Sequence, residues 1–202
     1  MREIDWKNEY SDEEGIIYLR PMTYDDAETY VNWRNSESVN KYFIYRGKFT
    51  VEGQKNWIRD NLETGKAASM MVCLTGKRFE DAAEGADENE GAELQSTADR
   101  AIGNVYLLNI DNINKKAEYG VMIGDESIRG KGLGTKIAKL MLKYAFDGLG
   151  LHRVYLRALE GNDRAVKSYM NAGFKKEGFL VDDVCIDGEF KSVTWMAAVS
   201  GR

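Results

Sequence analysis

A glycine-rich segment in the second half of the chain has the composition of a phosphate-binding loop. It reads Arg129-Gly130-Lys131-Gly132-Leu133-Gly134-Thr135, and it stands between an apolar stretch and an amphipathic one. Glycines let main-chain N–H groups approach a ligand closely, and the N-terminus of a helix attracts anions. The segment therefore predicts a site for a phosphate or diphosphate group, with a plain glycine-rich turn as the structural alternative.

Two familiar phosphate loops fit this spacing poorly. A P-loop has four residues between its first glycine and Gly-Lys, followed by Ser or Thr. Here five residues separate Gly124 from Gly130, and Gly132 follows Lys131. A dinucleotide loop needs Gly-x-Gly-x-x-Gly, whereas this chain continues as Gly-x-Gly-x-Gly. Both of these nucleotide-binding classes are disfavoured.

A second spaced set of residues lies downstream. It reads Asn162-Asp-Arg-Ala165-Val-Lys-Ser-Tyr169-Met-Asn-Ala-Gly173-Phe174. Seven residues are close to two helical turns, so Asn162 and Tyr169 share one face of the predicted helix. Asn162 also suits a helix N-cap, and Tyr169 also suits an amphipathic core.

Taken in order, the two segments resemble the Arg/Gln-x-x-Gly-x-Gly/Ala and Asn-x-x-Ala/Ser-x-x-x-Tyr-x-x-x-Gly-Phe patterns of GNAT acetyltransferases. The resemblance covers about 117–199 clearly and 16–74 loosely. It implies that acetyl-CoA is the co-substrate, and that main-chain N–H groups of 129–135 hold its diphosphate. Asn162 and Ala165 would bind the same molecule, Asn162 through the pantetheine arm. Tyr169 would protonate the departing CoA thiolate, a role that suits a phenol of pKa ~10.

The same resemblance implies direct acetyl transfer in a ternary complex, without a covalent enzyme intermediate. In the strand before the loop, Glu118, Gly120 and Met122 share one face. Gly120 would leave room for the acyl-pantetheine, and main-chain groups of Met122 and Ile123 would pair with it. Glu118 is the candidate base, directly or through water, with a structural carboxylate as the alternative. The lone histidine, His152, is expected to be structural or at the surface.

The acceptor is expected to be a primary amine. Segments including Glu118-Tyr119-Gly120 and Asp187-Gly188 resemble the GNAT branch that acetylates N-terminal amines of ribosomal proteins. That branch also contains amino-sugar and polyamine acetyltransferases, and a non-catalytic acetyl-CoA-binding domain is a further alternative. The resemblance places Trp33, Arg34 and Asn35 near the acceptor entrance, although a helix end with a packed Trp is also consistent. Ser192, where an Asp is common, departs from the pattern.

The surrounding pattern predicts an α/β (α+β) domain of the GNAT fold, with a mixed central sheet of six to seven strands and about four helices. Expected strands are 16–19, 69–74, 101–108, 115–123, 153–158, 181–186 and 190–199. Helices are expected after Thr23 and Thr50 and at 135–146 and 163–172. One domain should span 1–202, with the acidic segment 77–100 as a mobile hairpin loop.

The composition excludes several other classes. A net charge of −5 disfavours nucleic-acid partners and is mildly favourable for a cationic amine. The two cysteines, Cys73 and Cys185, have no metal-type spacing, so no metal is expected. The chain lacks a signal-peptide core and a membrane-length apolar run. The expectation is a cytoplasmic transferase, monomeric or homodimeric, without a membrane partner.

Overall fold

A mixed seven-stranded sheet runs through the chain in a computed structural model that describes residues 4–76 and 99–201. The strand order is β1-β2-β3-β4-β5-β7-β6; β4 and β5 are parallel, and the other neighbouring pairs are antiparallel. The strands are β1 (Ile17–Pro21), β2 (Ala68–Leu74), β3 (Arg100–Asp111), β4 (Lys116–Ile123), β5 (Arg153–Leu159), β6 (Lys175–Ile186) and β7 (Glu189–Val199). The predicted fold class and strand number are confirmed.

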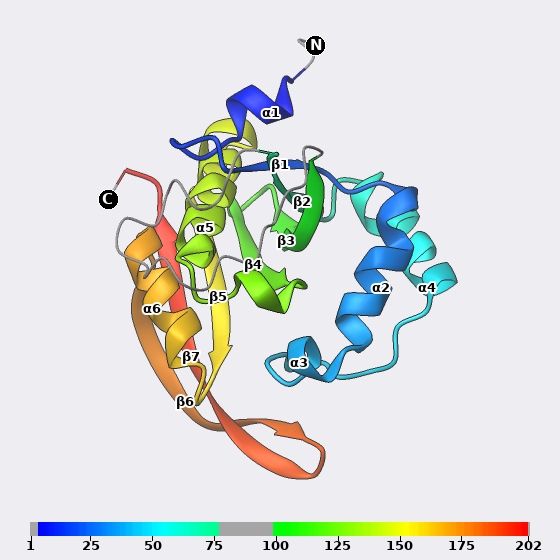
Figure 1. Cartoon of the computed structure of the whole chain (residues 1–202). Helices are drawn as coiled ribbons and strands as arrows, with labels where there is room; N and C mark the ends of the chain where they lie inside the picture. The colour runs from blue at the N-terminus through cyan, green and yellow to red at the C-terminus, as the bar shows by residue number, and fades with distance from the viewer. Residues whose placement is uncertain (1–3, 77–98, 202) are drawn as a thin grey trace, which may run out of the picture.

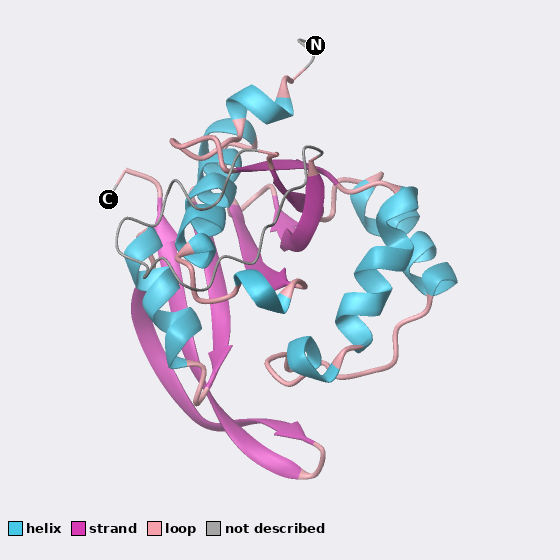
Figure 2. Ribbon diagram, in the orientation of Figure 1, coloured by secondary structure: helices cyan, strands magenta, loops and turns pink. Residues whose placement is uncertain are grey.

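Helices lie on both sides of this sheet (Figures 1 and 2). They are α1 (Trp6–Glu9), α2 (Ala27–Asn35), α3 (Glu37–Asn40), α4 (Val51–Trp57), α5 (Leu133–Lys143) and α6 (Asp163–Ala172). Helix α4 continues as a π-helical segment, Ile58–Leu62, and α5 as another, Tyr144–Gly148. Short 3₁₀ turns occupy Tyr24–Asp26 and Glu126–Ile128.

Alternation along β2 shows how the two layers are built. Met70 and Val72 belong to the core cluster under α5, whereas Met71 and Cys73 pack with residues of α2 and α4. A period of two places these pairs on opposite faces of the strand. The sheet therefore separates a layer of α5 and α6 from a layer of α2 and α4.

The apolar stripe of α5 fixes that helix on the sheet. Ile137 and Met141, one turn apart in the predicted helix, are completely buried, as their i, i+4 spacing favours. Burying a side chain of this size contributes about 1.5–3 kcal/mol. The stripe thereby holds the N-terminus of α5 beside the end of β4.

Several element boundaries differ from the predicted ones. Helix α5 begins at Leu133 instead of 135, because Gly132, with φ 78°, supplies a left-handed N-cap. Strand β6 begins at Lys175 instead of 181; its exposed residues show no alternation, and pairing with β7 forms the strand. The helices α1 and α3, four residues each, were not predicted. Asp187 (φ 52°) and Gly188 (φ 83°) form a hairpin turn between the predicted strands 181–186 and 190–199, as an Asp-Gly pair favours.

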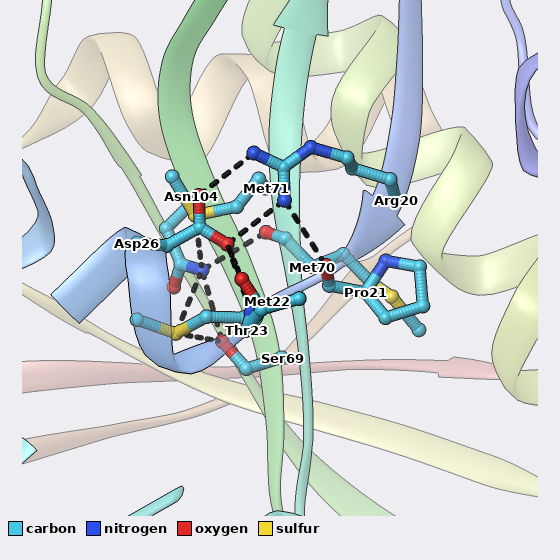
Figure 3. A network of polar contacts seen from close by, with 9 residues as sticks. All are labelled: Arg20, Pro21, Met22, Thr23, Asp26, Ser69, Met70, Met71 and Asn104. Carbon is cyan, nitrogen blue, oxygen red and sulfur yellow. Dashed lines mark hydrogen bonds and ion pairs between the residues drawn. The ribbon is translucent and has the colours of Figure 1, made fainter. Parts of the chain in front are cut away.

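A polar network ties the start of α2 to the first three strands (Figure 3). The Arg20 guanidinium donates to both carboxylate oxygens of Asp26, at 2.8 and 2.7 Å, and the Thr23 N–H donates to the same carboxylate at 2.8 Å. Deeper inside, the Asn104 amide donates to the Ser69 hydroxyl and to a β2 carbonyl, both at 2.9 Å. These bonds set the position of α2 and hence of its far end.

Residues 77–98, most of the acidic segment expected to be mobile, lie outside the described residues. Leu74 pairs with Arg100 across β2 and β3, so the segment joins two neighbouring strand ends. No helix in the part of the chain that the structure describes is long and apolar enough to cross a membrane.

Candidate active site

Strands β4 and β5 part from one another after the third residue of β4. Three pairs hold them together, and the last is Glu118 with Tyr155. Beyond that pair, β4 continues against β3 as far as Ile123, and β5 continues against β7 as far as Leu159. The ends of β4 and β5 point apart in Figure 1. One edge of β4 is therefore left for an extended ligand.

The glycine-rich loop lies at the mouth of this gap, between β4 and α5. Gly130 and Gly132 have φ of 85° and 78°, a left-handed backbone that side-chain-bearing residues rarely adopt. The first N–H groups of a helix have no intrahelical acceptor. Among the described residues, none accepts a hydrogen bond from the N–H groups of Gly132, Leu133 or Gly134. These groups can hold an anion at the helix N-terminus.

The two ends of the expected diphosphate-binding run are engaged within the chain. The Arg129 N–H donates to the Glu126 carbonyl at 3.1 Å, and the Thr135 N–H donates to the Gly132 carbonyl at 3.1 Å. The Thr135 hydroxyl donates to the carbonyl of Ser168. The main-chain N–H groups that could bind the diphosphate are therefore those of 130–134 instead of the expected 129–135. Lys131 lies between the two left-handed glycines of this segment.

The Arg129 side chain turns inward instead of toward a ligand. Its guanidinium donates twice to the Ile123 carbonyl, at 3.0 and 2.8 Å, and once to the Ser38 carbonyl in α3, at 3.3 Å. Arg129 therefore connects the glycine-rich loop to β4 and α3 by hydrogen bonds.

The same bonds indicate which main-chain groups of β4 face the gap. Because the Ile123 carbonyl accepts from Arg129, it points away from β3. Main-chain groups alternate in direction along a strand, so those of Val121 also face the gap and those of Met122 face β3. This geometry favours Val121 and the Ile123 N–H over the predicted Met122 as partners of a bound chain.

Tyr169 reaches the gap from α6. Its ring centroid lies 5.8 Å from that of Tyr119 on β4, with the rings nearly perpendicular, and 6.0 Å from that of Phe174. Burial raises the pKa of Tyr169 to about 12, so the phenol keeps its proton at physiological pH. None of the described residues hydrogen-bonds its hydroxyl, which leaves it available to a ligand.

Asn162 stands at the N-cap of α6, as predicted, but its side chain makes no capping hydrogen bond. Its main-chain carbonyl accepts from Val166 at 3.1 Å, as a first helical bond does. The side-chain amide remains open to a ligand. Ala165, half-buried, lies on the next turn.

Glu118 is held in an ion pair on the other face of β4. Arg157 donates to its carboxylate at 2.9 Å, and Asn109 does so at 3.5 Å. The pairing favours the structural interpretation of this carboxylate over the base. The room expected over Gly120 does not exist, because the Tyr106 ring occupies the place where a Cβ of residue 120 would stand.

The predicted acceptor residues form the end of α2, and two of them hold the following segment. Arg34 is 3% exposed, lies 3.8 Å from the centre of the Phe43 ring, and donates to the Tyr45 carbonyl at 2.9 Å. Asn35 exchanges two hydrogen bonds with the main chain of Phe49, each 2.9 Å. Arg34 and Asn35 thereby hold the segment 40–50 against the end of α2.

Trp33 is placed differently from its two neighbours. Its indole occupies the space where a Cβ of Gly124 would stand, directly after β4. It therefore lies beside the loop and on the α2 side of the sheet, which keeps it a candidate for the acceptor entrance.

Sequence reasoning missed Arg164 and Tyr119. The Arg164 guanidinium on α6 contacts the position that a Cβ of Gly130 would take, and no described residue pairs with it. Tyr119 contacts Tyr169. Arg164 occupies a position at which the Asn-x-x-Ala pattern specifies no residue type. Tyr119 belongs to the Glu118-Tyr119-Gly120 segment of the resemblance, which implies no role for its side chain.

Comparisons with known proteins place this geometry in a family. Residues 17–175 match the model described as an acetyltransferase (GNAT) domain. Spermidine N(1)-acetyltransferase of Escherichia coli (strain K12) is 32% identical over 180 residues, covering 89% of this chain and 84% of that protein. A putative ribosomal N-acetyltransferase of Bacillus subtilis, YdaF, is 36% identical over 86 residues, covering 43% of this chain and 46% of that protein.

Solved structures share the fold. A spermidine N-acetyltransferase from Vibrio cholerae, in complex with CoA and spermine, matches with a TM-score of 0.73 at 23% identity. The match covers 91% of this chain and 95% of that one.

Proposed function

The chain belongs to the GNAT acetyltransferase family, and from this premise we propose that it transfers the acetyl group of acetyl-CoA to a primary amine of a polyamine such as spermidine. The resemblance to a spermidine acetyltransferase over 89% of the chain carries the choice of acceptor. The gap between β4 and β5 supports the choice of donor, because it joins a diphosphate site to Tyr169.

The residues present fit an acyl-CoA. Main-chain N–H groups of Gly132, Leu133 and Gly134 would hold the diphosphate at the start of α5. The open edge of β4, at Val121 and Ile123, would hold the pantetheine arm in an extended conformation. Asn162 would bind the same arm from α6.

Bound acetyl-CoA supplies a thioester whose carbonyl carbon a neutral amine attacks, forming a C–N bond and breaking the C–S bond. Tyr169 donates its phenolic proton to the departing sulfur and regains one from solvent. A water molecule accepts the proton that the amine gives up, and Glu118 is the second candidate for this base. Its ion pair with Arg157 makes it the less favoured of the two.

A second candidate acceptor is the N-terminal amine of a protein, which is the substrate of the branch named above. The match to the putative ribosomal acetyltransferase favours it, but that match spans 43% of this chain. Polyamine acetylation rests on the longer alignment and is the first choice.

A panel of amines tests the proposal. Release of free CoA thiol is measured with spermidine, spermine, amino sugars and N-terminal peptides, using Tyr169→Phe as the impaired control. We expect the highest kcat/KM for a polyamine. A higher value for a peptide would overturn the proposed acceptor, and no amine-dependent release with any member would overturn the proposed transfer.

A further inference from the structure

Tyr119 carries a buried hydroxyl that the folded chain leaves without a partner. The residue is 4% exposed, and no described residue hydrogen-bonds its phenolic oxygen. A buried polar group without a hydrogen bond destabilises a fold. Phenylalanine would fill the same space without this cost, so packing alone does not account for the hydroxyl.

The hydroxyl belongs to the residue at which the gap opens. Glu118 makes the last pair between β4 and β5, and Tyr119 is the next residue of β4. The Tyr119 side chain lies on the face covered by α6, where its ring packs against Tyr169 at 5.8 Å and Phe174 at 5.4 Å. Tyr119 therefore lies beside the proposed proton donor Tyr169 and at the edge of β4 that β5 leaves unpaired.

The ionisation state of Tyr119 suits a hydrogen-bond donor. Burial raises the pKa of Tyr119 well above its ordinary value, and the neighbouring Tyr169 and Tyr106 raise it further. A neutral phenol donates one hydrogen bond. The acyl-pantetheine arm offers carbonyl oxygens as acceptors, in its amides and in its thioester.

We propose that the Tyr119 hydroxyl donates a hydrogen bond to a carbonyl oxygen of the acyl-pantetheine arm where that arm enters the gap. The inference rests on the proposed use of acetyl-CoA. It assigns to β4 a side-chain contact with the ligand in addition to its main-chain edge. The unpaired hydroxyl is then satisfied in the complex.

The test is Tyr119→Phe, which removes one oxygen and keeps the ring. Without ligand, we expect its unfolding midpoint to equal or exceed that of the wild type. Calorimetric titration should show acetyl-CoA binding weakened about 2- to 12-fold, the range of one net hydrogen bond. A parallel titration with CoA identifies the acceptor: equal weakening points to a pantetheine amide, and weakening of acetyl-CoA alone points to the thioester.

Tyr144→Phe is the control, because Tyr144 packs against the same core cluster, directly after the end of α5. It should bind both ligands as the wild type does. Unchanged binding of both ligands by Tyr119→Phe would overturn the inference while leaving the proposed function intact. A wild-type protein that does not bind acetyl-CoA would instead defeat the proposed function.

Discussion

At the scale of single residues, several groups that the chain leaves without a hydrogen bond lie around the gap between β4 and β5. The N–H groups at the start of α5, the Asn162 amide and the Tyr169 and Tyr119 hydroxyls have no hydrogen-bond partner among the described residues. Buried and helix-terminal polar groups are ordinarily paired. Their clustering around one gap indicates a ligand with anionic and carbonyl groups.

The proposed role of Tyr169 as proton donor predicts a loss in turnover with little loss in binding. Tyr169→Phe should lower kcat roughly 10²- to 10⁴-fold, the usual effect of removing a general acid, and leave the KM for acetyl-CoA nearly unchanged. Because burial raises its pKa to about 12, Tyr169 stays protonated at lower pH and should cause no alkaline fall in wild-type kcat below pH 10. A variant with kcat within a factor of three of the wild type would remove Tyr169 from this role.

Arg164 predicts a cationic contact to a phosphate. Its guanidinium lies over Gly130 without a described partner, whereas that of Arg129 is engaged inside the fold. Arg164→Ala should raise the Kd for CoA about 12- to 150-fold, since hydrogen bonds to charged groups contribute roughly 1.5–3 kcal/mol. Lys167→Ala, an exposed cation one turn along α6, is the control. Equal affinities in both variants would contradict the prediction.

At the scale of elements, period and capping explain what could be predicted. The α5 stripe, the Thr50 cap and the Asp187-Gly188 turn are local signals, and the structure confirms each. Tyr106 over Gly120 could not be foreseen, because it depends on their pairing across β3 and β4. The inward turn of Arg129 depends likewise on Ser38, 91 residues away in sequence.

The ionic network at the start of α2 predicts a pH-dependent stability. Burial acts to raise the pKa of Asp26, but hydrogen bonds from Arg20 and Thr23 outweigh it, so the pKa lies below its ordinary value. Asp26→Asn should lower the free energy of unfolding at pH 7 by about 1–3 kcal/mol. A carboxylate whose pKa is lowered by folding stabilises the folded state at pH values above its unfolded pKa. The loss in free energy of unfolding caused by Asp26→Asn should therefore shrink as the pH falls below about 4.

Urea unfolding at pH 7 and pH 3 measures the effect. Asp60→Asn is the control, because Asp60 forms an exposed pair with Arg59 and should change stability little. A penalty for Asp26→Asn that is the same at both pH values would show that its carboxylate charge is not the cause.

At the scale of the whole molecule, the negative charge is concentrated in one segment. Residues 77–98 hold seven acidic and two basic residues, an excess equal to the net charge of −5 for the entire chain. The remainder is therefore neutral overall. The negative net charge, which would favour a cationic acceptor, therefore comes from residues 77–98. It gives little information about the charge of the site.

We propose that the described residues form one domain to which 77–98 is an addition. Replacing that segment by a three-residue Gly-Ser turn should preserve a single unfolding transition and the affinity for CoA, since its ends join at the Leu74–Arg100 pair. A shorter loop should raise stability by about 1 kcal/mol. Scanning calorimetry measures the unfolding transition and the stability, and titration calorimetry measures the affinity for CoA. Loss of folding or of CoA binding would contradict the proposal.

We propose that the gap between β4 and β5 holds acyl-CoA, and a crystal structure with CoA tests this directly. The diphosphate oxygens should lie about 2.7–3.2 Å from the N–H nitrogens of Gly132, Leu133 and Gly134, with the arm running along β4 to Tyr169. A CoA molecule bound elsewhere, with the loop and the β4 edge untouched, would contradict the account.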